Sequence, residues 1–334
     1  MLATTWNEKR DDPIRRQRLF RGMARAILSL ARIPQPRIGS FQFQDDGTVS
    51  LTNRPLTSTI VLLENDGAPR TIQRDETYTC IESYVSDLLT FHDSSFLSNP
   101  NAVFTEKICK GEMAVKTILK ALSYRYIRRE SRAGPFLLQF TDLHIGNIFV
   151  DDDWNVTCFI DLEWVCALPA EQLAVPYWLT NRGIDQLVEE HLAVFDGIRK
   201  EFMLAFEEEE KATSACQDAP LARIMREMWE SGGVWFWFSV DSINAAYSLG
   251  FKHLMPRFTN KPPLVRETMS EFWCEGSSEM VARKMADYET YDAKLRMAFA
   301  MPSENSATTE EPGGANFGCC WQRELEESNF ASLF

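Results

Sequence analysis

The sequence predicts an α+β protein that is predominantly helical and carries small β-hairpins. Two observations support this fold class. Apolar residues recur at spacings of three and four along several long segments, which is typical of amphipathic helices. Short strand-like runs near residues 40–53 and 148–160 are each divided by a polar turn, which is typical of hairpins.

The first predicted helix covers residues 13–32. Pro13 suits the first turn of a helix, because a first-turn residue needs no N–H group for an intrahelical hydrogen bond. Leu19, Met23 and Ile27 then follow one another at four-residue spacing and give the helix an apolar face.

Residues 38–63 are predicted to form a β-hairpin and its continuation. Gly47 lies in the turn between the two strands and is free to take a positive φ. Helical spacing then predicts two helices at residues 79–92 and 103–129.

After residue 164 the chain is predicted to be mostly helical, with Thr180 as the N-cap of the first helix. The run Glu207–Glu210 is interpreted as a solvated helix face and not as a metal site. The aromatic string between Trp229 and Phe238 is assigned to the core. The predicted helices cover residues 180–211, 219–231, 234–255 and 263–300.

These elements suggest three parts: a leader at residues 1–12, a domain at residues 13–300, and a tail at 301–334. The tail begins with a small, polar, low-complexity stretch and is predicted to be disordered.

Composition narrows the function classes. The net charge of −13 argues against non-specific binding to nucleic acid or to an anionic membrane, because both need a basic surface. The first residues lack the apolar segment of a signal peptide, and the apolar stretch at 234–240 is too short to cross a bilayer. The eight cysteines form no CxxC pair, and Cys158 and Cys166 are expected to be buried free thiols. We therefore expect a reducing, cytoplasmic location.

The segment FTDLHIGNIFVDDDWNVTCFIDLEW, residues 140–164, is where chemistry is predicted. Residues 148–150 and 156–160 are expected to form two strands joined by the polar turn Asp151–Asn155. Folding about this turn places position 147 opposite position 160, so Asn147 and Asp161 emerge together at the open end of the hairpin.

Two oxygen donors held together suit a hard cation such as Mg²⁺. Asp142 lies five residues before Asn147, on the loop that enters the hairpin. It is near enough to act as a general base while staying off the metal, which gives the three parts of a phosphoryl-transfer site. Asn and Asp are also common turn residues, so each of the three alone would more often be structural.

The segment DLHIGNIFVDDDWNVTCFIDLEW resembles the catalytic-loop-to-metal-loop segment of the aminoglycoside phosphotransferase and choline kinase-like superfamily, in particular its fungal phosphotransferase-domain branch. SLARIPQPRIGSF, LTNRPLT, SYVSDLLTFHD and PYWLTN also resemble that branch, so the likeness covers about residues 6–300. It implies a protein-kinase-like C-terminal lobe, ATP and Mg²⁺ as cofactors, and a small-molecule hydroxyl acceptor. It also implies Asp142 as the catalytic base and Asn147 and Asp161 as metal ligands.

The sequence departs from the family pattern in two places. Phe140 stands where related enzymes often carry a histidine, and His144 is expected to support the loop through hydrogen bonds. Before Asp142 no G-x-G-x-x-G motif occurs, and AVKTILK at 114–120 follows a helical pattern, whereas the nucleotide-binding lysine of kinases lies on a strand. The chain is therefore expected to lack most of the N-terminal lobe, and the nucleotide-binding residues stay unassigned.

Three functions remain open at this point. The first is an ATP- and magnesium-dependent small-molecule phosphotransferase, which the three site residues favour. The second is a non-catalytic kinase-like fragment or binding scaffold, which the missing lobe favours. The third is a helical interaction protein in which the acidic turn only caps a hairpin.

Overall fold

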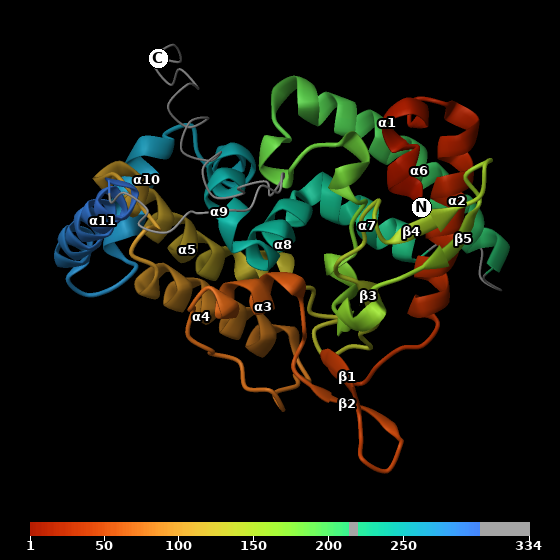
Figure 1. Ribbon diagram of the computed structural model, residues 1–334, viewed down its shortest axis with the longest axis horizontal. Helices are drawn as coiled ribbons and strands as arrows, with labels where there is room; N and C mark the ends of the chain where they lie inside the picture. Colours follow the sequence, from red (N-terminus) through yellow and green to blue (C-terminus); the bar gives the residue numbers. More distant parts are fainter. Residues whose placement is uncertain (214–219, 301–334) are drawn as a thin grey trace, which may run out of the picture. The chain divides into compact units, whose positions relative to one another are not determined.

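The computed structural model describes residues 1–213 and 220–300, and Figure 1 shows the course of the chain. The chain divides into a compact unit of residues 1–291 and a second unit that begins at residue 292. The described residues are mostly helical and include a small antiparallel sheet, which confirms the predicted α+β class. The tail predicted at 301–334 lies outside the described residues.

The helical elements are longest in the middle and at the end of the described chain. The α-helices are α1 (Trp6–Lys9), α2 (Pro13–Ala31), α3 (Ser58–Asn65), α4 (Ile81–Ser98), α5 (Glu106–Tyr126), α6 (Glu189–Thr213), α7 (Pro220–Ser231), α8 (Gly233–Asp241), α9 (Ile243–Leu249), α10 (Pro262–Glu271) and α11 (Ser277–Ala300). Shorter helical turns are η1 (Leu2–Thr4), η2 (Leu162–Trp164), η3 (Ala170–Gln172), η4 (Tyr177–Thr180), η5 (Ile184–Gln186), η6 (Gly250–Leu254) and η7 (Met255–Arg257).

The strands form two antiparallel groups. They are β1 (Gly39–Phe43), β2 (Val49–Asn53), β3 (Leu137–Phe140), β4 (Ile148–Val150), β5 (Val156–Phe159) and β6 (Val165–Leu168). A four-stranded sheet has the order β2-β1-β6-β3, while β4 and β5 pair only with each other. The predicted hairpins β1–β2 and β4–β5 are thus confirmed. Strand β6, which follows Asp161 in the chain, pairs with β1 and β3.

Helix α2 begins where the sequence predicts. The Asp12 side chain accepts hydrogen bonds from the backbone N–H groups of Ile14 (2.9 Å) and Arg15 (3.2 Å), so it caps the helix start. The apolar face packs on α6, where the rings of Phe20 and Phe202 lie 5.3 Å apart. Beside it runs the β4–β5 hairpin (Figure 1), which approaches the helix closely at Gly22.

Residues 1–12, predicted as a leader, are folded into the compact unit. Leu2 and Trp6 belong to the main hydrophobic core and are only 0% and 1% exposed. The Trp6 ring stacks on Trp154 at the tip of the β4–β5 hairpin, with centroids 5.6 Å apart. The backbone N–H of Ala3 donates to Ile145 O, so this segment also supports the loop that precedes Asn147.

The chain after the β1–β2 hairpin differs from the prediction. Residues 58–63 do not continue the hairpin but lie in helix α3, because the Thr57 side chain accepts from Ile60 N and starts a helix there. The predicted helices at 79–92 and 103–129 are confirmed as α4 and α5, with shifted ends.

The segment after residue 164 is less helical than predicted. Strand β6 was missed, and residues 180–186, predicted as the start of a long helix, lie in the short turns η4 and η5 and the segment between them. Thr180 is not an N-cap: it ends η4, and its hydroxyl donates to Tyr177 O. The long helix α6 begins only at Glu189.

The run Glu207–Glu210 is only partly a solvated face, which corrects the prediction. Glu209 is buried and pairs with Arg25 of α2, with an N–O distance of 2.7 Å. Glu210 is also buried and accepts from the backbone N–H groups of Leu221 and Ala222, so it caps the first turn of α7.

The helix predicted at 234–255 breaks at Ser242, whose hydroxyl oxygen accepts from Ala245 N and starts α9. The helix predicted at 263–300 is likewise divided into α10 and α11. The aromatic string is mostly core, as predicted, because Trp235, Phe236 and Trp237 are all buried.

Two further expectations meet different outcomes. Cys166 is buried as predicted, whereas Cys158 on β5 is exposed, which corrects the prediction for that residue. In the described part of the chain, none of the helices combines the length and apolar character needed to cross a bilayer.

Candidate functional site

The loop that carries Asp142 follows directly from the four-stranded sheet. Strand β3 ends at Phe140, where it pairs with Val165 of β6. The Thr141 hydroxyl then donates to Trp164 O, across to the turn that follows Asp161. This bond fixes the start of the Asp142 loop, and the Asp142 side chain is half-buried.

Asn147 holds the other end of the same loop and is 4% exposed. Its Nδ2 donates to Asp142 O over 3.0 Å, and its backbone N–H donates to His144 O over 2.9 Å. Because the amide nitrogen is used in this way, the amide oxygen is the end of the side chain that is left for another partner.

Position 147 lies opposite position 160, as the sequence predicts. Ile148 pairs with Phe159, and the backbone N–H of Ile160 donates to Asn147 O over 3.1 Å. Asp161 is the next residue and is exposed, with a left-handed backbone (φ 56°, ψ 49°) that turns the chain out of β5 into η2.

The two loops are therefore tied together at both ends. The bond from Thr141 to Trp164 joins them on one side, and the bond from Ile160 to Asn147 joins them on the other. Asp142 and Asp161 lie within the segments that these bonds bracket. We refer to Asp142, Asn147 and Asp161 on these tied segments as the loop site.

Two neighbouring residues support the loop site. His144 Nδ1 accepts from Gly146 N over 3.0 Å, which confirms that His144 supports the loop through a hydrogen bond. Phe140 stacks on Phe159 of β5, with ring centroids 5.3 Å apart. An aromatic contact thus joins the two segments at this position.

The donors of the loop site fit a hard cation. An exposed carboxylate at Asp161 and the amide oxygen of Asn147 are both oxygen ligands of the kind that Mg²⁺ prefers. Within residues 1–213 and 220–300, no group of three His, Cys, Asp or Glu side chains could hold a metal. A cation here would complete its shell with water or with oxygen atoms of a substrate.

The lysines that precede Asp142 do not lie on strands. Lys9 is in α1, and Lys107, Lys110, Lys116 and Lys120 are all in α5. Lys116, in the segment AVKTILK, is buried and forms an ion pair with Glu112, with an N–O distance of 2.5 Å. This confirms the helical interpretation of that segment.

Tyr177 links the loop site to a second acidic region that the sequence did not reveal. Burial raises the pKa of Tyr177, and the negative charges of Asp241, Asp142 and Asp185 raise it further. Asp241 lies at the end of α8, and burial raises its own pKa from 3.8 to about 6. Asp241 ends a helix that is almost entirely apolar, and it was not among the predicted site residues.

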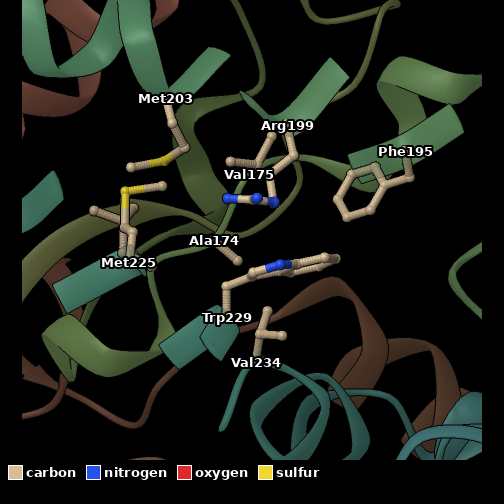
Figure 2. A pocket seen from close by; sticks show the side chains of 9 residues that line it. Ala174, Val175, Phe195, Arg199, Met203, Met225, Trp229 and Val234 are labelled. Atoms are coloured by element: carbon tan, nitrogen blue, oxygen red, sulfur yellow. The ribbon is translucent and has the colours of Figure 1, made fainter. Parts of the chain in front are cut away.

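Two small cavities lie near α8. One, of about 10 Å³, lies under Arg199, whose guanidinium lies over the Trp229 ring at 4.4 Å, as Figure 2 shows. This cavity is lined mostly by apolar side chains and has room for about one water molecule. The other, of about 50 Å³, lies between η3 and α8 and includes Glu171, Gln172, Trp237 and Asp241. We refer to the latter as the α8 cavity.

Comparison of the chain with models of known protein families, with characterised proteins and with solved structures finds no match.

Proposed function

We propose that this chain is an ATP- and magnesium-dependent phosphotransferase of the kinase-like type, acting on a hydroxyl group of a small molecule. The observation that carries the proposal is the pair of hydrogen bonds that brackets Asp142 and Asp161, one from the Thr141 hydroxyl to Trp164 O and one from Ile160 N to Asn147 O. The resemblance of residues 140–164 to the aminoglycoside phosphotransferase and choline kinase-like superfamily supports the same assignment.

The residues of the loop site divide the chemistry among them. Asn147 and Asp161 would hold Mg²⁺, which when bound neutralises charge on the phosphate groups. Asp142 would accept the proton of the acceptor hydroxyl. Its backbone carbonyl is fixed by Asn147 Nδ2 at 3.0 Å, so its position is determined by the same side chain that offers an oxygen to the cation.

A first experiment tests both cofactors on the purified full chain. Calorimetric titration with Mg-ATP is followed by measurement of ATP consumption in the presence of a panel of hydroxylated acceptors, including aminoglycosides and amino alcohols. We expect magnesium-dependent binding and acceptor-dependent turnover. Asp161→Asn is expected to weaken Mg-ATP binding, because the substitution replaces a charged cation ligand with a neutral amide.

Asp152→Asn is the matched control, since Asp152 is an exposed carboxylate at the tip of the same hairpin. We expect it to behave as the wild type. If Mg-ATP neither binds nor is consumed with any acceptor, the proposal is wrong.

A second candidate function is a non-catalytic kinase-like scaffold. It is favoured by one observation: the lysines before Asp142 all lie on helices, so none of them is placed as the strand lysine of a kinase. This function predicts Mg-ATP binding without turnover. Magnesium-dependent turnover that is lost in Asp142→Asn would exclude it.

A further inference from the structure

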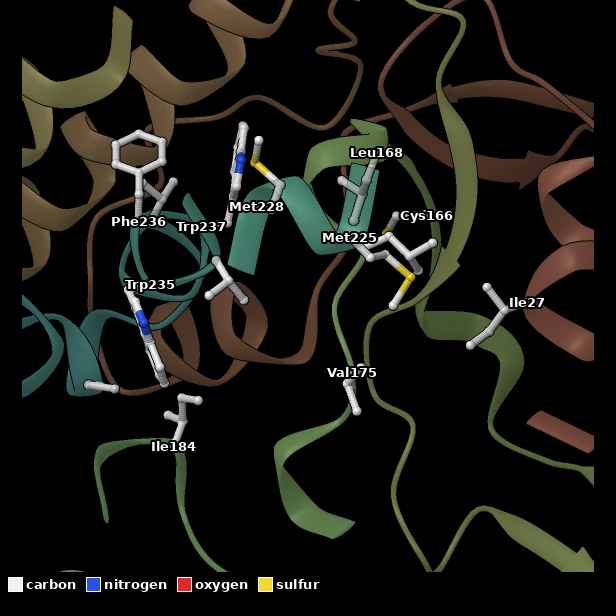
Figure 3. Packing of buried hydrophobic residues seen from close by; sticks show 14 of the residues in the cluster. Ile27, Cys166, Leu168, Val175, Ile184, Met225, Met228, Trp235, Phe236 and Trp237 are labelled. Atoms are coloured by element: carbon white, nitrogen blue, oxygen red, sulfur yellow. The ribbon is translucent and has the colours of Figure 1, made fainter. Parts of the chain in front are cut away.

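The α8 cavity lies between η3 and α8. It has a volume of about 50 Å³. One water molecule needs about 10–15 Å³ by this measure, so the cavity has room for about three to five particles of the size of water. Glu171 and Gln172 of η3 face it from one element, and Trp237 and Asp241 of α8 face it from the other. Figure 3 shows Trp237 on its helix within the surrounding core.

Several polar atoms at this cavity have no hydrogen-bond partner in the described protein. They are Glu171 Oε2, Gln172 Oε1 and Trp237 Nε1, whereas the amide nitrogen of Gln172 lies near the Tyr84 hydroxyl. Glu171 is only 2% exposed, and its other oxygen, Oε1, accepts from the Ser131 hydroxyl. Buried polar groups in folded proteins are nearly always partnered, so something other than protein is expected to occupy this space.

The charge at the cavity is also uncompensated. Among the ion pairs of the described residues, none includes Glu171 or Asp241. Asp241 lines the same cavity, and burial raises the pKa of its carboxyl group to about 6. Two carboxylates without a protein cation are costly in a partly dehydrated space unless a bound cation offsets them.

The lining favours a monovalent cation over a divalent one. The donor set is two carboxylates and one amide oxygen, and the remaining wall is apolar or aromatic, with Ala174, Val234 and Phe238. A small divalent ion gives up its water reluctantly and usually keeps several water molecules. Trp237 and Phe238 add aromatic rings, and aromatic rings attract cations such as ammonium.

We propose that the α8 cavity is a binding site for a monovalent cation of the size of K⁺ or NH₄⁺, held by oxygen atoms of Glu171, Gln172 and Asp241. A water molecule bound to the cation accepts a hydrogen bond from Trp237 Nε1. The cation joins η3 to α8, and it does so whether or not the loop site transfers phosphate.

The experiment measures thermal unfolding of the full chain at constant chloride concentration. Tetramethylammonium chloride, whose cation is too large for the cavity, is replaced stepwise by KCl, NH₄Cl, RbCl or LiCl. We expect the midpoint of unfolding to rise in a saturable manner with K⁺, NH₄⁺ and Rb⁺, because a ligand that binds only the native state stabilises it. Li⁺ is expected to produce a smaller rise.

Variants locate the effect. Glu171→Gln and Asp241→Asn are each expected to weaken the apparent affinity for K⁺ at least about tenfold, since each removes one charge from the ligand set. Glu130→Gln is the matched control: Glu130 is exposed and precedes Ser131, and we expect it to keep the affinity of the wild type.

A direct test needs only the wild-type chain, so it does not depend on whether the variants fold. Crystals grown with thallium(I) acetate should show an anomalous scattering peak between Glu171 and Asp241. A midpoint that is the same in K⁺ and in tetramethylammonium, together with no anomalous peak, would show that the cavity holds water only and would overturn the proposal.

Discussion

The loop site and the α8 cavity place carboxylates in opposite environments. At the loop site, Asp161 is exposed and Asp142 half-buried, and hydrogen bonds between adjacent loops hold both segments. At the α8 cavity, Glu171 is 2% exposed, and it lines the same space as Asp241 because η3 packs on α8. The first arrangement leaves carboxylates available to a ligand from solvent. The second arrangement leaves Glu171 and Asp241 in contact only with the protein interior and with what the cavity holds.

This difference predicts opposite consequences of removing a charge. At the loop site, neutralising a carboxylate should affect chemistry more than stability, because water already solvates the charge. At the α8 cavity, neutralisation should affect stability more than chemistry, because the interior solvates the charge poorly.

The largest expected effect is on catalysis by the loop site. Asp142→Asn should lower acceptor-dependent phosphoryl transfer by about 10²- to 10⁴-fold, since a positioned general base contributes about that factor. Mg-ATP affinity should change little, because Asp142 is not assigned as a ligand. Steady-state rates and calorimetry on the same preparations check this prediction, with Asp152→Asn as control. Full activity in Asp142→Asn would remove Asp142 from the proposed mechanism.

The next effect concerns Asp241 and depends on pH. Its pKa is about 6 in the folded chain and 3.8 in the reference state, so the folded state binds the proton more tightly. Between these values the stability contributed by this group falls as pH rises, and the loss is complete above about pH 6. Asp241→Asn removes the titration. The variant should therefore match the wild type near pH 4 and exceed its stability by about 1–3 kcal/mol at pH 8.

Urea denaturation of both proteins at pH 4 and pH 8, in tetramethylammonium chloride, checks this prediction. The neighbouring thiol does not interfere, because burial raises the pKa of Cys166 to about 11. Adding K⁺ should reduce the difference at pH 8, since the cation stabilises only the ionised wild type. A difference that stays constant from pH 4 to pH 8 would contradict the assignment of this titration to Asp241.

The same contrast explains how much of each site the sequence predicts. The loop site depends on local features: a polar turn at 151–155, two short apolar strands, and a five-residue spacing from Asp142 to Asn147. Such features fix neighbours by chain geometry alone, and the predicted pairing of positions 147 and 160 is confirmed. The chemical roles of the three residues stay predictions.

The α8 cavity was not predicted because its parts are distant in sequence. Glu171 follows a four-residue apolar run, VCAL, which is too short to be recognised as a strand by periodicity. Asp241 ends α8, whereas the sequence predicts one helix that continues to residue 255. The break at Ser242 depends on a single side-chain cap. Tertiary packing decides both features.

Glu210 is another residue whose partners are distant in sequence and were therefore not predicted. In sequence it belongs to a run of four glutamates that suggests a solvated face. In the fold it accepts from two backbone N–H groups at the start of α7, a partner that comes eleven residues later. Composition identifies the charge of such a residue, but only the fold identifies its partner.

A smaller effect, on the free energy of unfolding, is expected at Asn147, the buried residue of the loop site. Asn147→Ala removes the bond to Asp142 O and leaves that carbonyl to find another partner, so it should destabilise the chain by about 1–2 kcal/mol. Asn155→Ala is the matched control at the exposed tip of the hairpin, where Asn155 Nδ2 donates to Asp151 over 2.9 Å. We expect it to cost less than about 0.5 kcal/mol. Equal costs for the two variants would show that burial does not distinguish these positions.

The smallest effect on stability is expected at Asp161. Its left-handed backbone, with φ 56°, is one that glycine adopts without strain, and its side chain is exposed. In Asp161→Gly the relief of strain and the added freedom of the unfolded chain nearly cancel, so stability should stay within about 0.5 kcal/mol of the wild type. Asp161→Val is the contrasting variant and should cost about 1–2 kcal/mol, because a β-branched residue is strained there. If Asp161→Gly instead costs more than about 1 kcal/mol, which is more than an exposed side chain normally contributes, the carboxylate is needed to hold the turn. That result would favour a structural role for Asp161, in which the acidic turn only caps the hairpin, over a role as a cation ligand.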